Sequence, residues 1–344
     1  MKTNTESILG VFIIAIMVLG FAYSVYYSYV NNWWTFTWPS WSWKPHDSYR
    51  VEYFYEYEYL NYTKEFENIS SSTLSIRVTK GSISIYWEEL ESKICKIIIK
   101  IPKNEMANYS VNYSLDQNNT HLELVIISDI PSVELIFNPK YIYNLTYISA
   151  ETEMGNISIS TSAPYKYVSI GELRVSSSTG GFEGELKDAS IDQMVVDLDM
   201  GSIDIYADNA TIKSTMTLIT NMGSITMGLL NSQLPKKVSI STDMGSVSLK
   251  LSNVCCDNSS NVHIDTNMGS ISFQMLLNPN IPGRIKASTD AGSLSYAVDE
   301  NFEVVTSQRN YVELKTSDFS EGNGIDVTLI SNMGSIDITA ERLG

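Results

Sequence analysis

The sequence is poor in the residues that usually carry chemistry or covalent cross-links. Its 344 residues include three cysteines and three histidines, and charged residues make up only 18%. Cys95, Cys255 and Cys256 cannot form a disulfide framework, because their number is odd and two of them are adjacent. We expect all three to be buried. The formal net charge is −16. Nucleic acids and anionic lipid headgroups bind to a basic face, so we expect no nucleic-acid partner.

Motifs of catalysis and metal binding are also missing. There is no H-E-x-x-H, no G-x-S-x-G, no P-loop and no C-x-x-C. The histidines, which show no metal-ligand spacing, are His46, His121 and His263. Parallel β-helix enzymes that cut acidic polysaccharides cluster carboxylates or basic residues on one outer face. The group most similar to such a cluster here is Asp197, Asp199 and Asp204, but these residues occupy different positions of the repeat. The sequence therefore predicts neither an enzyme nor a metal or cofactor site.

A long uncharged stretch stands near the N-terminus. Residues 7–43 contain no charged side chain, and residues 8–27 are mostly apolar. At about 1.5 Å per helical residue, such a segment crosses a bilayer core of about 30 Å. We predict a cytoplasmic tail over 1–7 and a transmembrane anchor over 8–30. The alternative is a signal peptide with an apolar region over 8–19, cleaved after the small residues Gly20 and Ala22.

Tryptophan is concentrated next to this anchor. Five of the six tryptophans lie within residues 33–43. Tryptophan prefers the boundary between membrane and water, where its ring is half hydrated. We interpret residues 31–49 as an interfacial stalk. A packing strip and a carbohydrate-stacking patch are the alternatives.

Asparagine sequons point to an extracytoplasmic chain. Between residues 51 and 160, seven of ten asparagines head an Asn-x-Ser/Thr sequon. Sequons mark surface loops of exported, N-glycosylated proteins. The alternative is a β-protein that is merely rich in Asn, Ser and Thr. The nine glycosylation candidates in the chain are Asn61, Asn68, Asn108, Asn112, Asn118, Asn144, Asn156, Asn209 and Asn258.

One short motif recurs along the second half of the chain. The spacings between its glycines are 46, 22, 22, 24, 23 and 42 residues, and a degenerate copy at Gly180 splits the first into 25 and 21. We place a further hidden copy near residues 311–314. After each glycine, Ser and apolar residues alternate with the period of two that a half-buried strand shows. Each unit thus predicts a strand, a corner and a second strand. The corner glycines are Gly155, Gly201, Gly223, Gly245, Gly269, Gly292 and Gly334.

Stacking such units predicts an all-β fold, a parallel β-helix or β-solenoid with coils of about 22 residues. We expect a positive φ at the corner glycines and a hydrogen bond from the preceding Asp or Asn to the turn's backbone. We expect one core stack of apolar residues and a second of methionines, with a copper-binding methionine array as the alternative. A calcium site is the alternative for the corner Asp and Asn residues, whose alternation separates like charges. The apolar stack is Ile203, Ile225, Val247, Ile271, Leu294 and Ile336, and the methionine stack is Met200, Met222, Met244, Met268 and Met333.

Over residues 73–344 the chain resembles the "putative adhesin" domain family of bacterial and archaeal envelope proteins. The resemblance is carried by the Gly-Ser/Asp-Ile repeats behind a membrane anchor and by the segments "TLSIRVTKGSISIYW", "KIIIKIPK" and "VELIFNPKYIYNLTYISAETEMGNISIS". It implies a β-helical surface domain without established catalysis, and it implies no binding residue. Dense sequons with almost no cysteine favour an archaeal cell surface.

The sequence therefore predicts a smaller, sequon-rich β-domain over 50–150 and a β-solenoid over 151–344. We expect a single-pass membrane protein with a cytoplasmic N-terminus, the bulk of the chain outside and the helix in the lipid bilayer. As function we expect an adhesin-like scaffold or interaction module with protein or glycan partners. The alternatives are a polymerising subunit, which would self-associate at the C-terminal rung, and an envelope-stress sensor. The last motif ends near the C-terminus, and we expect its open rung to be covered by loops or used for docking.

Overall fold

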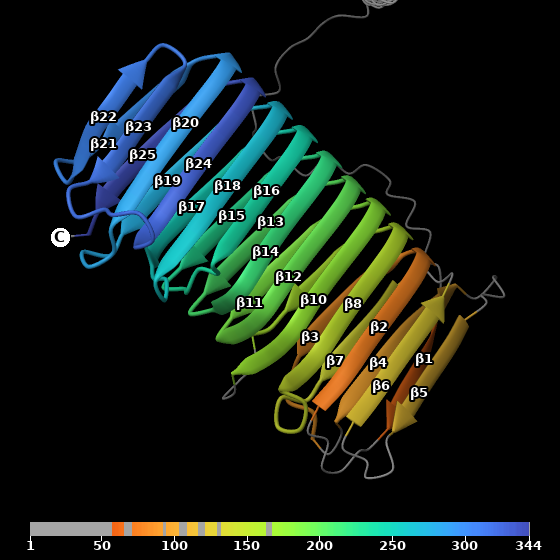
Figure 1. The fold of residues 1–344 in the computed structure, drawn as a ribbon. Helices are drawn as coiled ribbons and strands as arrows, with labels where there is room; N and C mark the ends of the chain where they lie inside the picture. The colour runs from red at the N-terminus through yellow and green to blue at the C-terminus, as the bar shows by residue number, and fades with distance from the viewer. Residues whose placement is uncertain are drawn as a thin grey trace, which may run out of the picture. The chain divides into compact units, whose positions relative to one another are not determined.

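The computed structural model describes residues 57–64, 71–91, 94–102, 109–115, 121–128, 132–162 and 167–343. In these ranges every regular element is a β-strand, and the strands form two sheets of 12 and 13 strands (Figure 1). The first sheet contains, in spatial order, β1 (Tyr57–Lys64), β4 (Cys95–Pro102), β7 (Ser132–Phe137), β3 (Ser82–Trp87), β9 (Ile157–Ser160), β11 (Phe182–Lys187), β13 (Ile203–Asp208), β15 (Ile225–Leu230), β17 (Val247–Val254), β19 (Ile271–Leu277), β25 (Ile336–Arg342) and β21 (Leu294–Val298). The second contains β22 (Phe302–Gln308), β23 (Tyr311–Thr316), β20 (Gly283–Ala291), β24 (Gly324–Met333), β18 (Ser259–Met268), β16 (Lys237–Met244), β14 (Thr211–Met222), β12 (Ala189–Met200), β10 (Val168–Thr179), β8 (Asn144–Met154), β2 (Ser71–Lys80), β6 (His121–Ser128) and β5 (Tyr109–Leu115).

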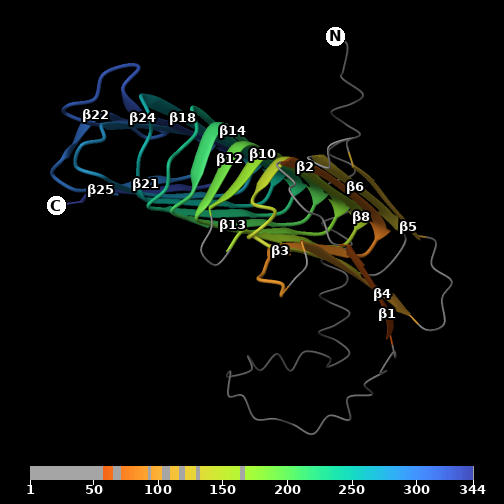
Figure 2. The same cartoon turned by 90° about the horizontal axis from the view of Figure 1, so that it is seen from below.

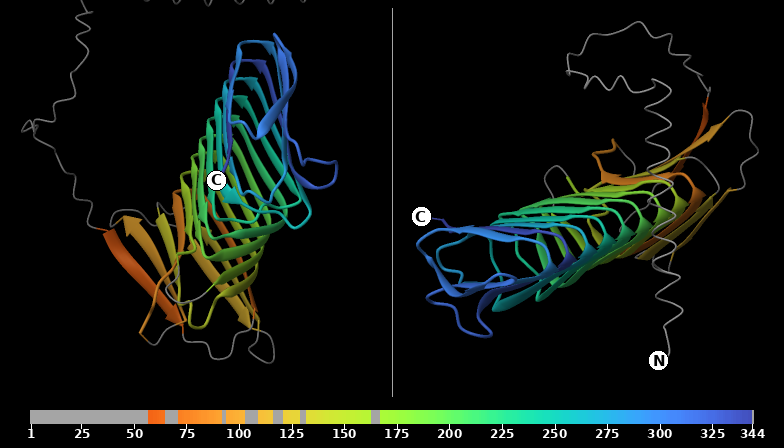
Figure 3. Two further views of the ribbon diagram at one scale, coloured as in Figure 1. Left: turned by 90° about the vertical axis from the view of Figure 1, so that its left-hand side faces the viewer. Right: turned by 90° about the horizontal axis from the view of Figure 1, so that it is seen from above.

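The chain passes from the second sheet to the first at each corner motif, so that one strand of each sheet makes up a coil. Figures 2 and 3 show the sheets as two layers, and the buried side chains form one core between them. The predicted apolar stack is confirmed in register, since Ile203 pairs with Ile225 and Ile225 with Val247. All of its members are buried except the partly buried Leu294. The prediction of an all-β repeat fold is therefore confirmed.

Glycine is required at the corners by close approach of successive coils. A Cβ built on Gly245 would lie 1.9 Å from the carbonyl oxygen of Gly223, and the same overlap recurs at the other corners. The predicted positive φ holds at Gly155, Gly201 and Gly245, with values of 148°, 151° and 156°. The prediction is wrong for Gly223, Gly269, Gly292 and Gly334, which have no such φ. At these corners glycine is required because a Cβ would overlap the carbonyl oxygen of the stacked coil.

A hydroxyl caps the same carbonyl from inside the corner. Thr220 donates to the Gly201 carbonyl oxygen at 2.9 Å, and Thr242 donates to that of Gly223 at 3.0 Å. Both threonines are buried and occupy inward strand positions. Because each hydroxyl satisfies a carbonyl next to the core, a polar residue at this buried position stabilises the corner.

The prediction that five methionines form a second core stack is wrong. Their side chains are 42–54% exposed. The alternation of inward and outward side chains ends earlier than we expected. The last inward position, two residues before each methionine, holds threonine, serine or leucine. The two residues that follow it are both exposed, as the burial pattern of β14 shows. Methionine therefore lies outside the corner.

The order of the coils departs from the order of the sequence at the C-terminal end. Strands β24 and β25 lie between β18/β19 and β20/β21, although β20 and β21 come first in the chain. Figure 1 shows the dark blue β24 between β18 and β20. The last motif thus does not form the terminal coil. Its rung is covered by the coil of β20 and β21, and not by loops as we expected. The hidden copy near residues 311–314 is also wrong, because β23 pairs antiparallel with β20 and β22 as a hairpin.

A matching exchange occurs at the other end. The coil of β2 and β3 lies between β6/β7 and β8/β9, while β4, β1 and β5 extend the sheets by antiparallel pairing. We expected a separate β-domain over 50–150. In the structure these strands continue the same two sheets, and residues 55–344 cluster as one compact unit.

The predicted tail, anchor and tryptophan-rich stalk lie outside the described residues. No helix in the part of the chain that the structure describes is long and apolar enough to cross a membrane. The cysteines are all free, but only Cys95 is buried, and its burial raises the pKa of that thiol to about 12. The expected burial of Cys255 and Cys256 is wrong, because they follow β17 in a surface loop where Cys255 is exposed and Cys256 half-buried.

Candidate interaction surfaces

The predicted glycosylation candidates lie on the surface wherever the structure describes their side chains. Asn112, Asn144, Asn156, Asn209 and Asn258 are all exposed. Asn61 lies in the edge strand β1 and Asn112 in the edge strand β5, so both N-terminal sheet edges carry a sequon. The remaining candidates, Asn68, Asn108 and Asn118, lie outside the described residues.

A groove opens on the outer face of the first sheet where one strand lacks an outward side chain. Gly228 on β15 stands in register between Tyr206 on β13 and Lys250 on β17. A Cβ added at Gly228 would meet only the Tyr206 ring, at 3.7 Å. The groove has a volume of about 590 Å³, which falls within the range of small-ligand sites. Besides these three residues it is lined by Glu183, Gly184, Glu185, Asp204, Ile205, Thr226, Met227 and Ser248.

The walls of this groove differ in chemistry. Tyr206 is 43% exposed and offers an aromatic face. Outside the groove lining, Lys187 of β11 lies with its ammonium nitrogen 6.0 Å from the centroid of the Tyr206 ring, and it pairs with the Glu185 carboxylate at 2.5 Å. That hydrogen bond holds the pKa of Glu185 below its ordinary value and raises the pKa of Lys187. The groove therefore combines an aromatic surface, carboxylates, hydroxyls and a lysine, which suits a polar ligand with one apolar face.

The carboxylates that the sequence singled out are divided between the two sheets. Asp197 and Asp199 line a small acidic groove of about 230 Å³ together with Glu151 and Glu153. Asp204 lies on the other sheet, in the groove beside Tyr206. Within the described ranges, no group of three or more His, Cys, Asp or Glu residues could hold a metal ion.

The corner Asp and Asn residues bond to each other rather than to their own turn. Asn221 donates to Asp199 at 3.2 Å, and Asn267 donates to Asp243 at 2.8 Å. The alternation that separates Asp199 from Asp243 thus also supplies both carboxylates with an amide donor from the next coil. Asn332 continues the ladder by donating to Asn267 at 2.8 Å. The predicted bond to the local backbone is replaced by this ladder between coils.

A second ladder, at the opposite corner, was missed by sequence reasoning. Asn209 donates to Asp188 at 2.6 Å and Asn253 donates to Asn231 at 2.7 Å. All four residues have φ between 47° and 52°, a conformation that Asn and Asp tolerate better than most side chains. The recurrence of Asp or Asn at intervals of 21 and 22 residues is the signal that could have revealed it.

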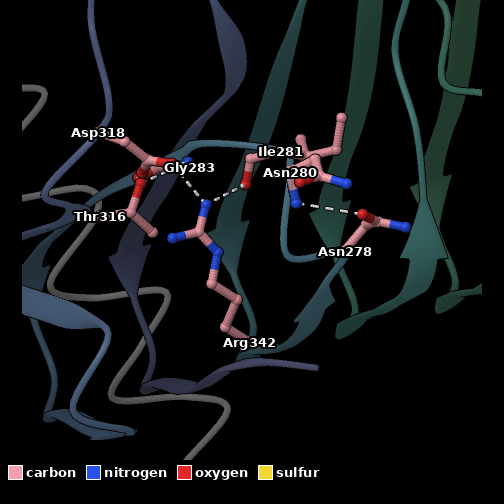
Figure 4. A network of polar contacts seen from close by, with 7 residues as sticks. All are labelled: Asn278, Asn280, Ile281, Gly283, Thr316, Asp318 and Arg342. Atoms are coloured by element: carbon pink, nitrogen blue, oxygen red, sulfur yellow. Dashed lines mark hydrogen bonds and ion pairs between the residues drawn. The ribbon is translucent and has the colours of Figure 1, made fainter. Parts of the chain in front are cut away.

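The C-terminal end is fastened by one arginine. The Arg342 guanidinium donates to Asp318 at 2.6 Å and to the Ile281 carbonyl at 3.3 Å (Figure 4). The backbone amide of Arg342 donates to Asp299 at 2.7 Å. Burial alone would raise the pKa of Asp318, but hydrogen bonds from Arg342 and Thr316 outweigh it and the pKa is lowered. Arg342 thus connects β25 to the loops that precede β20 and follow β23.

The outermost coil is closed on one side and open on the other. In the second sheet, the β22–β23 hairpin covers β20. In the first sheet, β21 pairs with β25 and has no further neighbour among the described strands. Tyr296 of β21 is exposed, and its hydroxyl donates to the Ser307 hydroxyl of β22 at 3.4 Å.

No protein-family model and no curated protein matches the sequence. Solved structures similar to this chain include a putative cell adhesion protein from Clostridium sporogenes (14% identity, 83% of this chain and 100% of that chain covered, TM-score 0.27). Two others are a putative adhesin from Bacteroides fragilis (12% identity, 82% and 97% covered, TM-score 0.38) and one from Parabacteroides distasonis (10% identity, 84% and 98% covered, TM-score 0.38). Membership of the family that the repeats resemble stays a prediction.

Proposed function

We propose that this chain is a membrane-anchored, extracytoplasmic, N-glycosylated β-solenoid that acts as an adhesin-like interaction module at the cell surface. The observation that carries the proposal is the position of the sequons. Five of them have described side chains, and all five are exposed although they occupy different strands, corners and loops. Attachment of a glycan at an exposed asparagine needs no rearrangement of the core. The apolar segment over residues 8–30 supplies the anchor.

The groove beside Tyr206 is the surface to which we assign partner binding. It lies on a rigid sheet, because its three central strands each have parallel neighbours on both sides. Lys250 lines the groove and is exposed, so its ammonium group can contact a ligand. The exposed tyrosine can stack on the apolar face of a sugar or a peptide side chain.

Two measurements test the location and the glycans. Protease added to intact cells should remove residues 45–344, and fragments obtained only after lysis would refute the topology. Glycopeptide mass spectrometry should find Asn258 occupied, because it lies in an exposed loop. Asn209 should be poorly occupied, because its amide nitrogen donates to Asp188 in the corner ladder.

Adherence of cells tests the groove. A strain that lacks the protein should lose adherence, and the wild-type gene should restore it. A Tyr206→Ser variant should fail to restore adherence at equal surface abundance. Thr339→Ala, which alters the same outer face on β25 outside the groove, serves as the matched control. Full adherence with Tyr206→Ser would remove the groove from the proposal.

Self-association is a second candidate function, because the edge of β21 offers unpaired backbone groups. Sedimentation of the purified ectodomain at micromolar concentration should then reveal dimers. An Ala297→Lys substitution, which places a charge on this exposed edge, should abolish them. A monomeric wild-type ectodomain would exclude this candidate.

A further inference from the structure

The exposed methionines occupy one position of the fold. Of the ten methionines in the described residues, six are exposed, and each of these immediately precedes a corner glycine. The other four, Met194, Met216, Met227 and Met275, are fully buried. Methionine thus appears in two separate settings, the core and one outer edge.

Five of the exposed methionines lie on consecutive coils, and we call them the methionine ladder. Their Cα register is continuous, and in Figure 1 the arrowheads of their strands lie side by side along one edge. Met154 occupies the same position, but Thr179 separates it from Met200. The ladder consists, in spatial order, of Met200, Met222, Met244, Met268 and Met333.

The fold itself does not require methionine there. The equivalent position holds Lys80 on β2, Thr179 on β10 and Ala291 on β20. If the corner needed only an apolar cover, the leucine and isoleucine that fill the inward positions would serve as well. The repeated choice of a thioether therefore points to the chemistry of sulfur.

We propose that the methionine ladder binds a soft monovalent metal ion, Cu(I) or Ag(I), between thioethers of adjacent coils. Thioethers are soft ligands that select Cu(I) over hard cations. Neighbouring parallel strands lie about 4.8 Å apart, which is close to twice the metal–sulfur bond length of about 2.3 Å known for zinc. The Cα atoms of ladder methionines on adjacent coils are paired in register. Both thioethers can therefore reach one two-coordinate ion, because the three rotatable bonds of methionine let the sulfur atoms adjust.

The surroundings favour a cation. Asp199 and Asp243 precede Met200 and Met244, and both carboxylates are exposed beside the ladder. They accept hydrogen bonds from asparagine amides of the next coils, which fixes their position. Their charge lowers the electrostatic cost of a bound cation, while the ion itself would contact the neutral sulfur atoms.

Silver titration of the folded ectodomain tests the proposal. Ag(I), as the nitrate in chloride-free buffer, is redox-inert, and a Cys255→Ser/Cys256→Ser background removes the two thiols that are not buried. Methionine-methyl carbon-13 NMR should show shifts of the five ladder methyls. The four buried methionines are controls within the same spectrum and should not move.

Matched substitutions separate paired from single thioethers. Met222→Leu/Met268→Leu leaves no two ladder methionines on adjacent coils and keeps apolar volume at exposed positions. It should weaken Ag(I) binding in calorimetry at least tenfold with an unchanged melting temperature. Met154→Leu, at the isolated position, should bind as the parent does. The proposal is overturned if no ladder methyl shifts, if Met154 responds at the same silver concentration as the ladder, or if the double variant binds as tightly as the parent.

Discussion

Substitution of one corner glycine by alanine probes the feature on which the coil stack depends. In Gly245→Ala the new Cβ would lie 1.9 Å from the Gly223 carbonyl oxygen, whereas ordinary contact begins at 3.4 Å. The two coils must separate locally by about 1.5 Å, the difference between these distances. Overpacking of this kind costs about 1–3 kcal/mol, and alanine at a φ of 156° adds about 1–3 kcal/mol. We expect a loss of about 4 kcal/mol in the free energy of unfolding.

Thermal unfolding of the ectodomain measures this loss. At about 2–4 °C per kcal/mol, the Tm of Gly245→Ala should fall by about 8–16 °C. Gly228→Ala is the matched control, because it adds the same methyl to the open groove, where the nearest atom is 3.7 Å away. Its Tm should stay within about 2 °C of the wild type. If Gly245→Ala melts with the wild type, or if both variants are destabilised equally, close carbonyl approach is not what requires glycine.

Two further predictions address the core and the C-terminal fastening. Ile225→Asp places an unpaired carboxylate in the buried stack and should destabilise the fold by about 3–5 kcal/mol. Ser224→Asp, one residue away and exposed, should be nearly neutral. Equal urea midpoints (Cm) for the two variants would contradict the register. Because Arg342 lowers the pKa of Asp318 in the folded state, the stability from this pair is present above the unfolded pKa of about 3.9 and is lost as pH falls through the folded pKa. The stability difference between wild type and Arg342→Met should therefore be constant at neutral pH and shrink below about pH 4; a difference that does not change with pH would show that the pair contributes by packing alone.

The fold could be predicted from sequence where a local pattern determines it. The alternation after each corner places Ile225 inward, and the pairing of Asp with Asn on neighbouring coils follows from the repulsion of like charges. The exposure of Met222 could not be read from hydrophobicity, because methionine is common in cores. The informative residue is Thr220, a polar side chain in an inward position whose hydroxyl donates to the carbonyl of Gly201 in the preceding coil. In the structure the alternation ends at this threonine, and the methionine two residues later is exposed.

The spatial order of the coils could not be predicted either. Each motif specifies a coil, but nothing in the motif at Gly334 specifies its neighbours. That choice depends on contacts far apart in sequence, such as the bond from Arg342 to Asp318 and the covering of β20 by the β22–β23 hairpin. The groove beside Tyr206 was missed for a similar reason, because it results from a glycine that lies between tyrosine and lysine only across three coils.

The exchanged order of the coils at both ends determines how the molecule responds to mechanical load. Tension applied along β25 acts on two hydrogen-bonded ladders at once, because β19 and β21 flank that strand on either side. The strand must shear past both neighbours, and many bonds share the force, whereas an end strand could be peeled away one bond at a time. At the other end the coil of β2 and β3 is held in the same way between two others. Once the edge strands have detached, the first and last coils of the sequence are still held between two other coils. Neither end can therefore unfold one coil at a time in the order of the sequence.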